Sequence, residues 1–217
     1  MKKIVTIFTC ILLTVKLFGA VEEDILEATN SFKRFVETNK IPKQVIQNAK
    51  AIVIIPNYMK AGFLIGGQYG KGIVVIQKAN QEWTNPFFIS LAGGSLGLQI
   101  GFEANDTMLV FMTQKSLKEL LDSKITIGTE LSASVGPIKE NYNKYKEINF
   151  QSDILTYYIK EGLFLGASFD GAVINHDNER NSYLYGTSNV SSIIDIPKKK
   201  DIYGIRELDK YLDRYTK

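Results

Sequence analysis

The spacing of apolar positions along the chain changes near residue 50, from a helical period to a strand period. Over residues 21–39, apolar side chains recur every three or four residues and the opposite side is charged, which predicts an amphipathic helix. A second short helix is predicted over 42–49, where Pro42 is acceptable in the first helical turn. A helical pattern returns at the end of the chain, over 205–215.

The middle of the chain has the pattern of strands. The run AIVIIP over 51–56 predicts a strand ended by proline, and residues 61–77 are typical of two strands folded about glycine-rich turns. Further strands are predicted over 86–102 and over 153–174, after which NHDNER at 175–180 predicts an exposed polar turn.

One predicted helix, over 116–123, divides these strands, with Ser116 as N-cap and Glu119 completing a capping box. Nine glycines fall between residues 62 and 101, a density that marks bulges, sharp coiling or the close approach of another backbone. Together these patterns predict a single α+β domain with a strongly coiled, mainly antiparallel, barrel-like sheet, helices at its N-terminal end and a helix at its C-terminal end.

The first 20 residues differ from the rest of the chain. MKK is a basic start, residues 4–15 are an apolar run of 12, and small residues then precede the acidic VEED. This pattern predicts a secretory signal peptide over 1–20 and an exported domain over 21–217, with a retained N-terminal anchor as the main alternative. Cys10 is the only cysteine and lies within the apolar run, so we expect no disulfide and no thiolate chemistry in the exported domain.

The net charge of +3 comes entirely from this first segment, which holds Lys2, Lys3 and Lys16 and no acidic residue. Without these three lysines, 23 basic residues remain against 23 acidic ones. The predicted exported domain is therefore neutral, and its overall charge gives no support to nucleic-acid binding.

The segment GGSLG at residues 93–97 matches G-x-S-x-G, the nucleophile elbow of serine hydrolases. An elbow joins a strand to a helix, whereas LQIGF after this segment alternates like a strand. His176 is the only histidine, so it is the only candidate histidine base for a triad, and it falls in the predicted polar turn. A serine hydrolase that uses Ser95 is therefore the less favoured alternative, and we expect no enzyme.

Other chemical motifs in the chain are incomplete. GGQYGKG at 66–72 is similar to a phosphate loop, but Ile65 and Gly72 stand where that pattern requires glycine and serine or threonine. A glycine hairpin is the preferred interpretation. A single histidine and the lack of a loop with EF-hand spacing predict neither a metal nor a cofactor. The run PKKK at 197–200 is typical of a solvated charged segment.

Two interpretations remain open for the helix predicted over 21–39. Its apolar face packs on the sheet, as amphipathic helices of globular domains do, or it lies in a membrane interface with that face toward the lipid. In the second case four cations would lie near anionic headgroups: Lys33, Arg34, Lys40 and Lys43.

Several blocks of the chain, in a fixed order, resemble the SYLF domain family. They are AKAIVIIPNYMKAGFLIGGQYGKGIVV, then W and P before FFISLAGGSLGLQIG, then LVFMTQKSLKELLDSKITIGTELSASVGP, and then GLFLGASFDGAVI. The blocks extend over residues 48–174. The resemblance implies a non-enzymatic module that binds phosphoinositides and other anionic phospholipids. Eukaryotic members join the domain to modules such as SH3 and are tied to actin regulation.

The resemblance also implies candidate residues for lipid binding. Family members associate with membranes through an amphipathic N-terminal helix, a role that would fall here on Ile25, Phe32, Phe35 and Val36. Lys60 and Lys71, which flank the first glycine-rich segment, are further candidates for headgroup contact. An exported chain is expected in the periplasm, in contact with an anionic envelope phospholipid and not with actin. The alternative is an envelope structural or protein-interaction domain that binds no lipid.

Overall fold

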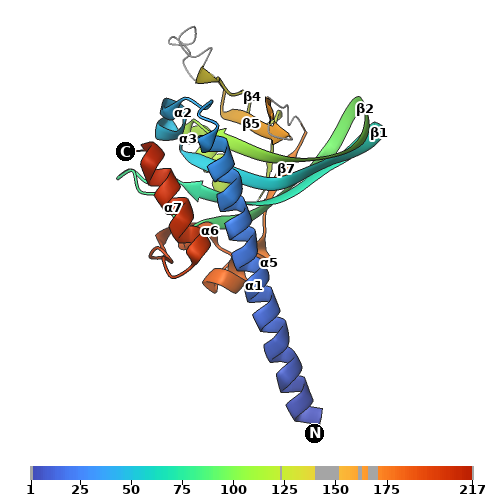
Figure 1. Ribbon diagram of the computed structural model, residues 1–217, viewed down its shortest axis with the longest axis vertical. Coiled ribbons are helices and arrows are strands. Elements are labelled where there is room, and N and C mark those ends of the chain that lie inside the picture. The colour runs from blue at the N-terminus through green and yellow to red at the C-terminus, as the bar shows by residue number, and fades with distance from the viewer. Residues whose placement is uncertain (1, 123, 140–151, 161–162, 166–170, 217) are drawn as a thin grey trace.

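The computed structural model describes residues 2–122, 124–139, 152–160, 163–165 and 171–216 (Figure 1). Its helices are α1 (Lys2–Glu37), α2 (Lys43–Asn48), α3 (Gln114–Leu121), α5 (Asn178–Tyr185), α6 (Val190–Asp195) and α7 (Tyr203–Thr216). Its strands are β1 (Ala51–Ile76), β2 (Phe87–Phe111), β3 (Lys124–Thr126), β4 (Ala133–Val135), β5 (Ile154–Lys160), β6 (Leu163–Leu165) and β7 (Val173–His176). The predicted α+β class with its N-terminal and C-terminal helices is confirmed.

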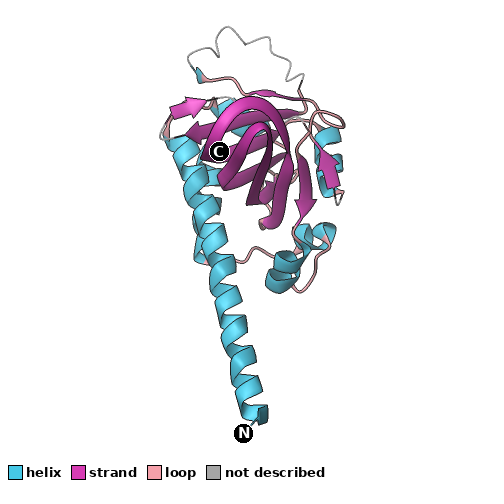
Figure 2. Cartoon of the chain, turned by 90° about the vertical axis from the view of Figure 1, so that its right-hand side faces the viewer, coloured by secondary structure: helices cyan, strands magenta, loops and turns pink. Residues whose placement is uncertain are grey.

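All seven of these strands belong to one sheet. The order β3-β7-β2-β5-β4 forms its path, with β1 paired to β2 and β6 paired to β5. Every pair is antiparallel except β4 with β5. The mainly antiparallel sheet predicted from the strand spacing is therefore present, and it is strongly curled (Figure 2).

The longest part of the sheet is a ribbon made by β1 and β2. Ala51 pairs with Phe111 at one end of the ribbon, and Val74 pairs with Phe87 at the other. The prediction of two strands over 61–77 is wrong, because β1 continues through this segment without a turn. The ribbon instead bends as a whole, and Figure 2 shows it as an arch.

Two glycines explain how this ribbon can bend so sharply. A Cβ atom added at Gly70 would lie 2.5 Å from Cγ2 of Ile55, and one added at Gly72 would collide with the carbonyl oxygen of Ile54. The two halves of β1 therefore approach each other where no side chain separates them. Close approach, and not a hairpin turn, is the reason for these two glycines.

Apolar side chains fill both faces of the sheet. Alternate residues of β1, such as Ile52 and Ile54, join one cluster with α1, α2 and α7, while Val53 and Ile55 join a second cluster with α3 and α6. A strand covered on both faces needs no polar alternation, which explains the uninterrupted apolar run at the start of β1.

Helix α1 packs on the first of these clusters with α7 alongside it (Figure 1). The Thr29 hydroxyl donates to the Gly204 carbonyl at 3.0 Å, and the Tyr215 hydroxyl donates to the Val36 carbonyl at 3.0 Å. The helix runs without a break across residue 20, the predicted end of the leader. Within the part of the chain that the structure describes, no helix combines the length and the apolar character needed to span a membrane.

Two local predictions need correction. Helix α3 is capped by Thr113, whose Oγ1 accepts from the Ser116 amide at 3.0 Å, so Ser116 lies inside the helix and is not its cap. Residues 175–180 do not form an exposed turn, because His176 ends β7 and Asp177 caps α5 by accepting from the Arg180 amide at 3.1 Å.

Candidate functional site

The four apolar residues considered for membrane insertion lie in the core. Ile25, Phe32 and Phe35 are fully buried and Val36 is 2% exposed. Two interpretations were left open for this helix, and in the structure its apolar side packs on the sheet. A lipid contact through these side chains would require α1 to leave the sheet.

The cations of α1 lie on the opposite, outer side of the helix. The side chains of Lys33 and Arg34 are 43% and 50% exposed. Lys33 Nζ is 3.8 Å from a carboxylate oxygen of Glu37, and Arg34 Nη2 is 2.5 Å from Oδ2 of Asp106. Lys40 and Lys43, both partly exposed, follow between the end of α1 and the start of α2. Their positions keep all four candidate cations accessible.

Helix α7 adds three cations that the sequence reasoning missed. Arg206, Lys210 and Arg214 recur every four residues and all three are exposed, so they form one stripe along the outside of α7. The stripe lies next to α1, because Lys33 of α1 and Arg214 of α7 lie over the same Tyr211 ring, at 5.7 and 5.5 Å from its centre. The four-residue spacing within the predicted helix was the signal that would have found it.

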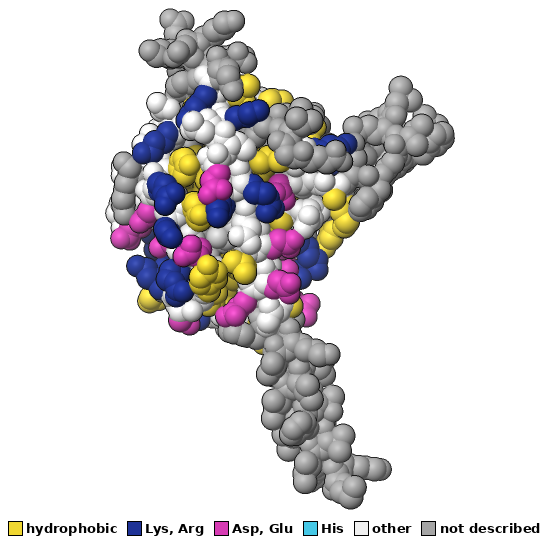
Figure 3. All heavy atoms as spheres, viewed as in Figure 1, with side chains coloured by type: hydrophobic (Ala, Val, Ile, Leu, Met, Phe, Trp, Pro, Cys, Tyr) yellow, Lys and Arg dark blue, Asp and Glu magenta, His cyan; other side chains and the backbone are white. Residues whose placement is uncertain are grey.

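We call these seven residues the cationic helical face: Lys33, Arg34, Lys40, Lys43, Arg206, Lys210 and Arg214. Figure 3 shows Lys and Arg side chains spread over the side of the molecule formed by α1, α2 and α7, with acidic side chains between them. A hydrogen bond with Tyr211, and next the charge of Glu37, raise the pKa of Lys33, which keeps this amine protonated. Exposed cations at this density can attract an anionic surface.

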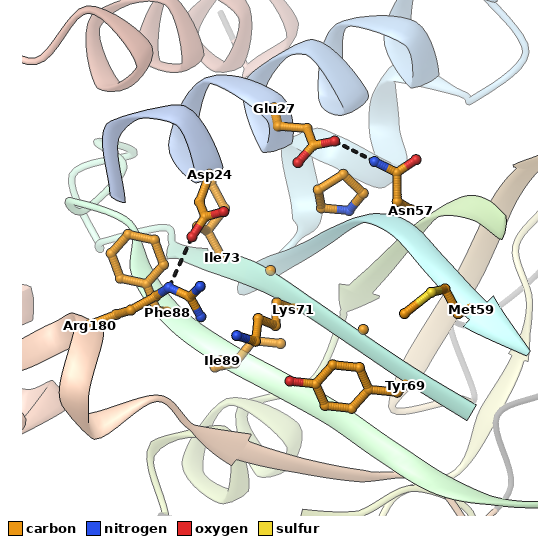
Figure 4. A pocket seen from close by; sticks show the side chains of 13 residues that line it. Asp24, Glu27, Asn57, Met59, Tyr69, Lys71, Ile73, Phe88, Ile89 and Arg180 are labelled. Carbon is orange, nitrogen blue, oxygen red and sulfur yellow. Dashed lines mark hydrogen bonds and ion pairs between the residues drawn. The ribbon is translucent and has the colours of Figure 1, made fainter. Parts of the chain in front are cut away.

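The two remaining candidates, Lys60 and Lys71, lie on β1, away from this face. Lys60 is 5.8 Å from the centre of the Tyr58 ring. Lys71 is exposed and lines a pocket of about 220 Å³ bounded by α1, β1, β2 and α5 (Figure 4). The structure therefore gives Lys71 a setting that differs from that of the helical cations.

This pocket contains charges of both signs. Arg180 of α5 places its Nε 2.9 Å from Oδ2 of Asp24 on α1 and its Nη1 2.9 Å from Oδ2 of Asp177. Glu27, one helical turn beyond Asp24, accepts a hydrogen bond from the side-chain amide of Asn57 (Figure 4). Burial raises the pKa of the Asp24 carboxyl, and the charges of Arg180 and Lys71 oppose that rise.

A β-bulge in β1 shapes the wall beside Glu27. The pairing with β2 shifts between Ile55 and Tyr58, and Asn57 adopts a left-handed backbone with φ of 48°. Asparagine tolerates this conformation better than most residues, and bulges re-aim side chains next to binding sites. The bulge thus places the Asn57 amide toward α1.

The serine-hydrolase alternative has no support in the backbone. Ser95 pairs with Gly66 in the middle of β2, so it is not at a strand-to-helix turn; its side chain lies outside the described residues. His176 Nε2 is 2.9 Å from the Leu120 carbonyl oxygen, and its ring contacts Phe87 edge-on at 5.4 Å. Both contacts are structural.

Lys198 of the PKKK run is not simply solvated, because its Nζ is 2.8 Å from Oδ1 of Asp209 and donates to the carbonyls of Trp83 and Thr84. Burial lowers the pKa of Lys198, and its bond to Asp209 opposes that change.

In the described ranges, no group of three or more His, Cys, Asp or Glu side chains is arranged to hold a metal ion.

Comparison with known proteins gives one family match and several relatives. The Ysc84 family, described as "Las17-binding protein actin regulator", matches residues 92–215. The chain is similar to LAS seventeen-binding protein 3 of Saccharomyces cerevisiae, with 28% identity over 185 residues, 81% of this chain and 40% of that protein. It is also similar to human SH3 domain-containing YSC84-like protein 1, with 30% identity over 182 residues, 81% of this chain and 52% of that protein. The chain thus spans about half or less of each of these two relatives.

Proposed function

The chain belongs to the Ysc84 family, and from this premise we propose that it binds anionic phospholipid membranes through the cationic helical face, without enzymatic chemistry. The family match also confirms the resemblance to SYLF domains. The lipid part of the proposal rests on what that resemblance implies and on the distribution of charge around α1 and α7.

The stripe of Arg206, Lys210 and Arg214 on α7 is the observation that carries the proposal. Three exposed cations follow one line along a helix, and Lys33 of the neighbouring helix α1 lies over the same Tyr211 ring as Arg214. A cation near an anionic bilayer contributes about 1 kcal/mol to binding. Ion pairs with Glu37, Asp106 and Glu207, at 3.8, 2.5 and 3.5 Å, reduce the contributions of Lys33, Arg34 and Lys210.

Burial of the apolar side of α1 determines the mode of binding that we propose. Phe32 and Phe35 are fully buried, so the helix presents charge and not apolar surface to a membrane. Docking is then peripheral and electrostatic, and it weakens as salt rises. We extend the proposal to an exported, membrane-associated location, in keeping with the predicted signal peptide over 1–20.

Co-sedimentation of the full chain with vesicles tests the proposal. We expect pelleting with vesicles that contain phosphatidylglycerol, weaker pelleting at high salt, and little with neutral phosphatidylcholine vesicles. The triple variant R206Q/K210Q/R214Q should lower partitioning on the order of 100-fold, from about 1 kcal/mol per cation. A matched triple variant outside the face, K78Q/K118Q/K124Q, controls for overall charge.

Two results would overturn the proposal. One is equal pelleting with neutral and anionic vesicles. The other is an equal loss in the two triple variants, since this would show that overall charge and not the helical face governs binding. Circular dichroism and thermal melts of both variants establish that they remain folded.

The names of the relatives favour protein binding as a second candidate function. The family description and the name of the yeast relative both refer to Las17 binding. The match covers 40% of that yeast protein, so more than half of it lies outside the shared region. Pull-down of purified Las17 by the full chain would support this candidate, and loss of that binding in R206Q/K210Q/R214Q would place it on the same face.

A further inference from the structure

The pocket between α1 and β1 is lined by one cation, Lys71, and one carboxylate, Glu27, that take no part in its ion pairs, although the charge of Lys71 acts on nearby Asp24. Arg180 forms ion pairs with Asp24 and Asp177, each at 2.9 Å. In the described parts of the chain, no ion pair is formed by Lys71 or by Glu27, although both line the pocket. Figure 4 shows them on opposite sides of it, Lys71 on β1 and Glu27 on α1.

The carboxylate of Glu27 is oriented without being neutralised. Its hydrogen bond comes from the uncharged amide of Asn57, which the β-bulge holds in place. A ligand ammonium would add the opposite charge that the Asn57 amide does not bring, so the site favours a cationic group at Glu27. Lys71 is exposed, and an ammonium on a flexible lysine stem suits a phosphate oxygen on the other side.

Apolar side chains form an exposed rim on the same pocket. Met59 and Tyr69 line it and are 38% and 41% exposed. Only two other large apolar side chains are exposed among the described residues, Val135 and Tyr203. Of these four exposed large apolar side chains in the described residues, two therefore border this one pocket, which is the pattern of a ligand site with an apolar entrance and a few fixed polar groups.

We propose that this pocket binds one zwitterionic phosphoethanolamine group, with the phosphodiester at Lys71 and the primary ammonium at Glu27. A ligand that meets both side chains must carry an anionic and a cationic group, as phosphoethanolamine does. The volume of about 220 Å³ is below the range of about 300–1,000 Å³ for drug-sized ligands, so the pocket holds a headgroup and not a whole lipid. The inference rests on the proposed membrane binding only for the source of the headgroup.

Soluble ligands test the pocket without any membrane. The full chain is titrated with glycerophosphoethanolamine, with glycerol 3-phosphate, which lacks the ammonium, and with ethanolamine, which lacks the phosphate. Chemical-shift changes give the three dissociation constants. We expect the zwitterion to bind at least about tenfold more tightly than either half. Equal affinity for the zwitterion and for one of its halves would overturn the proposal.

Two single variants assign the ends of the ligand. Lys71→Gln should weaken the binding of glycerophosphoethanolamine about tenfold and leave the binding of ethanolamine unchanged. Glu27→Gln should also weaken the binding of glycerophosphoethanolamine about tenfold, but it should leave the binding of glycerol 3-phosphate unchanged. The matched controls are Lys124→Gln on an exposed strand position and Glu37→Gln at the far end of α1. Variants that bind all three ligands as the controls do would contradict the assignment, and thermal melts verify that each variant is folded.

Vesicles then distinguish the source of the headgroup. Adding phosphatidylethanolamine to vesicles that already contain phosphatidylglycerol should increase binding of the unmodified chain and not of Lys71→Gln. If soluble glycerophosphoethanolamine binds but phosphatidylethanolamine adds nothing, the ligand is the free diester. If the soluble zwitterion fails while R206Q/K210Q/R214Q still loses anionic vesicles, the pocket proposal fails and the membrane proposal stands.

Discussion

The inner and outer faces of helices α1 and α7 differ in what they contribute. The inner faces hold fully buried residues such as Phe32 and Leu212, which belong to one core cluster with the sheet. The outer faces hold cations such as Arg206, Lys210 and Arg214, which are exposed. Stability comes from the inner faces through apolar burial, whereas the outer faces are free to serve binding.

The helix pattern alone does not show which side of the helix packs in the core and which side is available for binding, whereas the structure does. An amphipathic helix with a basic polar side fits a packed helix and a membrane-surface helix equally well. Here the apolar side is already covered by β1 and its neighbours, so a membrane would meet the charged side.

Truncation on the inner face should cost the most stability. Phe32→Ala removes a fully buried ring from the core and should lower the free energy of unfolding by about 3–5 kcal/mol. Tyr203→Ala is the matched control, because that ring is 55% exposed and its loss should cost far less. Urea unfolding of the two variants measures both effects. Similar losses of unfolding free energy in the two variants would contradict the assignment of Phe32 to the core.

A charge embedded in the fold should behave like the inner face. Partial burial raises the pKa of Asp153, but hydrogen bonds from Thr113 and Ser132 and the charge of Lys115 outweigh that effect, and the net pKa lies below 3.8. A lowered folded pKa stabilises the protein above pH 3.8, and this stabilisation is lost as the pH falls through the folded value.

Asp153→Asn tests this directly. The variant should lose about 1–2 kcal/mol at pH 7 and should show a smaller further loss on acidification than the unmodified chain. Unfolding curves between pH 7 and pH 2 measure both quantities. Asp201→Asn, at an exposed position, should leave the profile unchanged. An unaltered acid profile in Asp153→Asn would show that this carboxylate is not held as described.

The outer face should show the smallest effect on stability. Lys210→Gln removes an exposed amine whose ion pair with Glu207 is 3.5 Å long, so the free energy of unfolding should change by less than about 0.5 kcal/mol. Binding to anionic vesicles should nevertheless fall several-fold, from about 1 kcal/mol per cation. A larger change in the free energy of unfolding than in the free energy of vesicle binding would contradict the assignment of Lys210 to a binding face.

The local spacing of apolar residues predicted several helices correctly, because that spacing alone determines which side of a helix can be buried. The helix expected over 205–215 is α7, and the helix expected over 42–49 is α2. The N-cap of α3 was placed three residues too late, at Ser116 instead of Thr113. Thr113 caps this helix and its hydroxyl also donates to Asp153 at 2.8 Å, a partner 40 residues away in the sequence. Long-range contacts of this kind are invisible to a local pattern.

The ribbon and the pocket could not be predicted for the same reason. Gly70 and Gly72 are typical of a turn in the sequence. In the structure they lie within β1, where Ile54 and Ile55 come too close to them for a side chain to fit. The pocket draws its residues from α1, β1, β2 and α5. Lys71 was expected near a headgroup as a single cation, but its relation to Glu27 depends on how α1 crosses the sheet.

Hydrogen–deuterium exchange of the full chain with and without anionic vesicles tests the central claim most directly. If the outer faces bind while the inner faces stay packed, amides of α7 should exchange more slowly on vesicles, and those of residues 21–37 in α1 should keep their protection. Faster exchange across residues 21–37 on vesicles would contradict the account, because it would mean that α1 leaves the sheet to insert its apolar side.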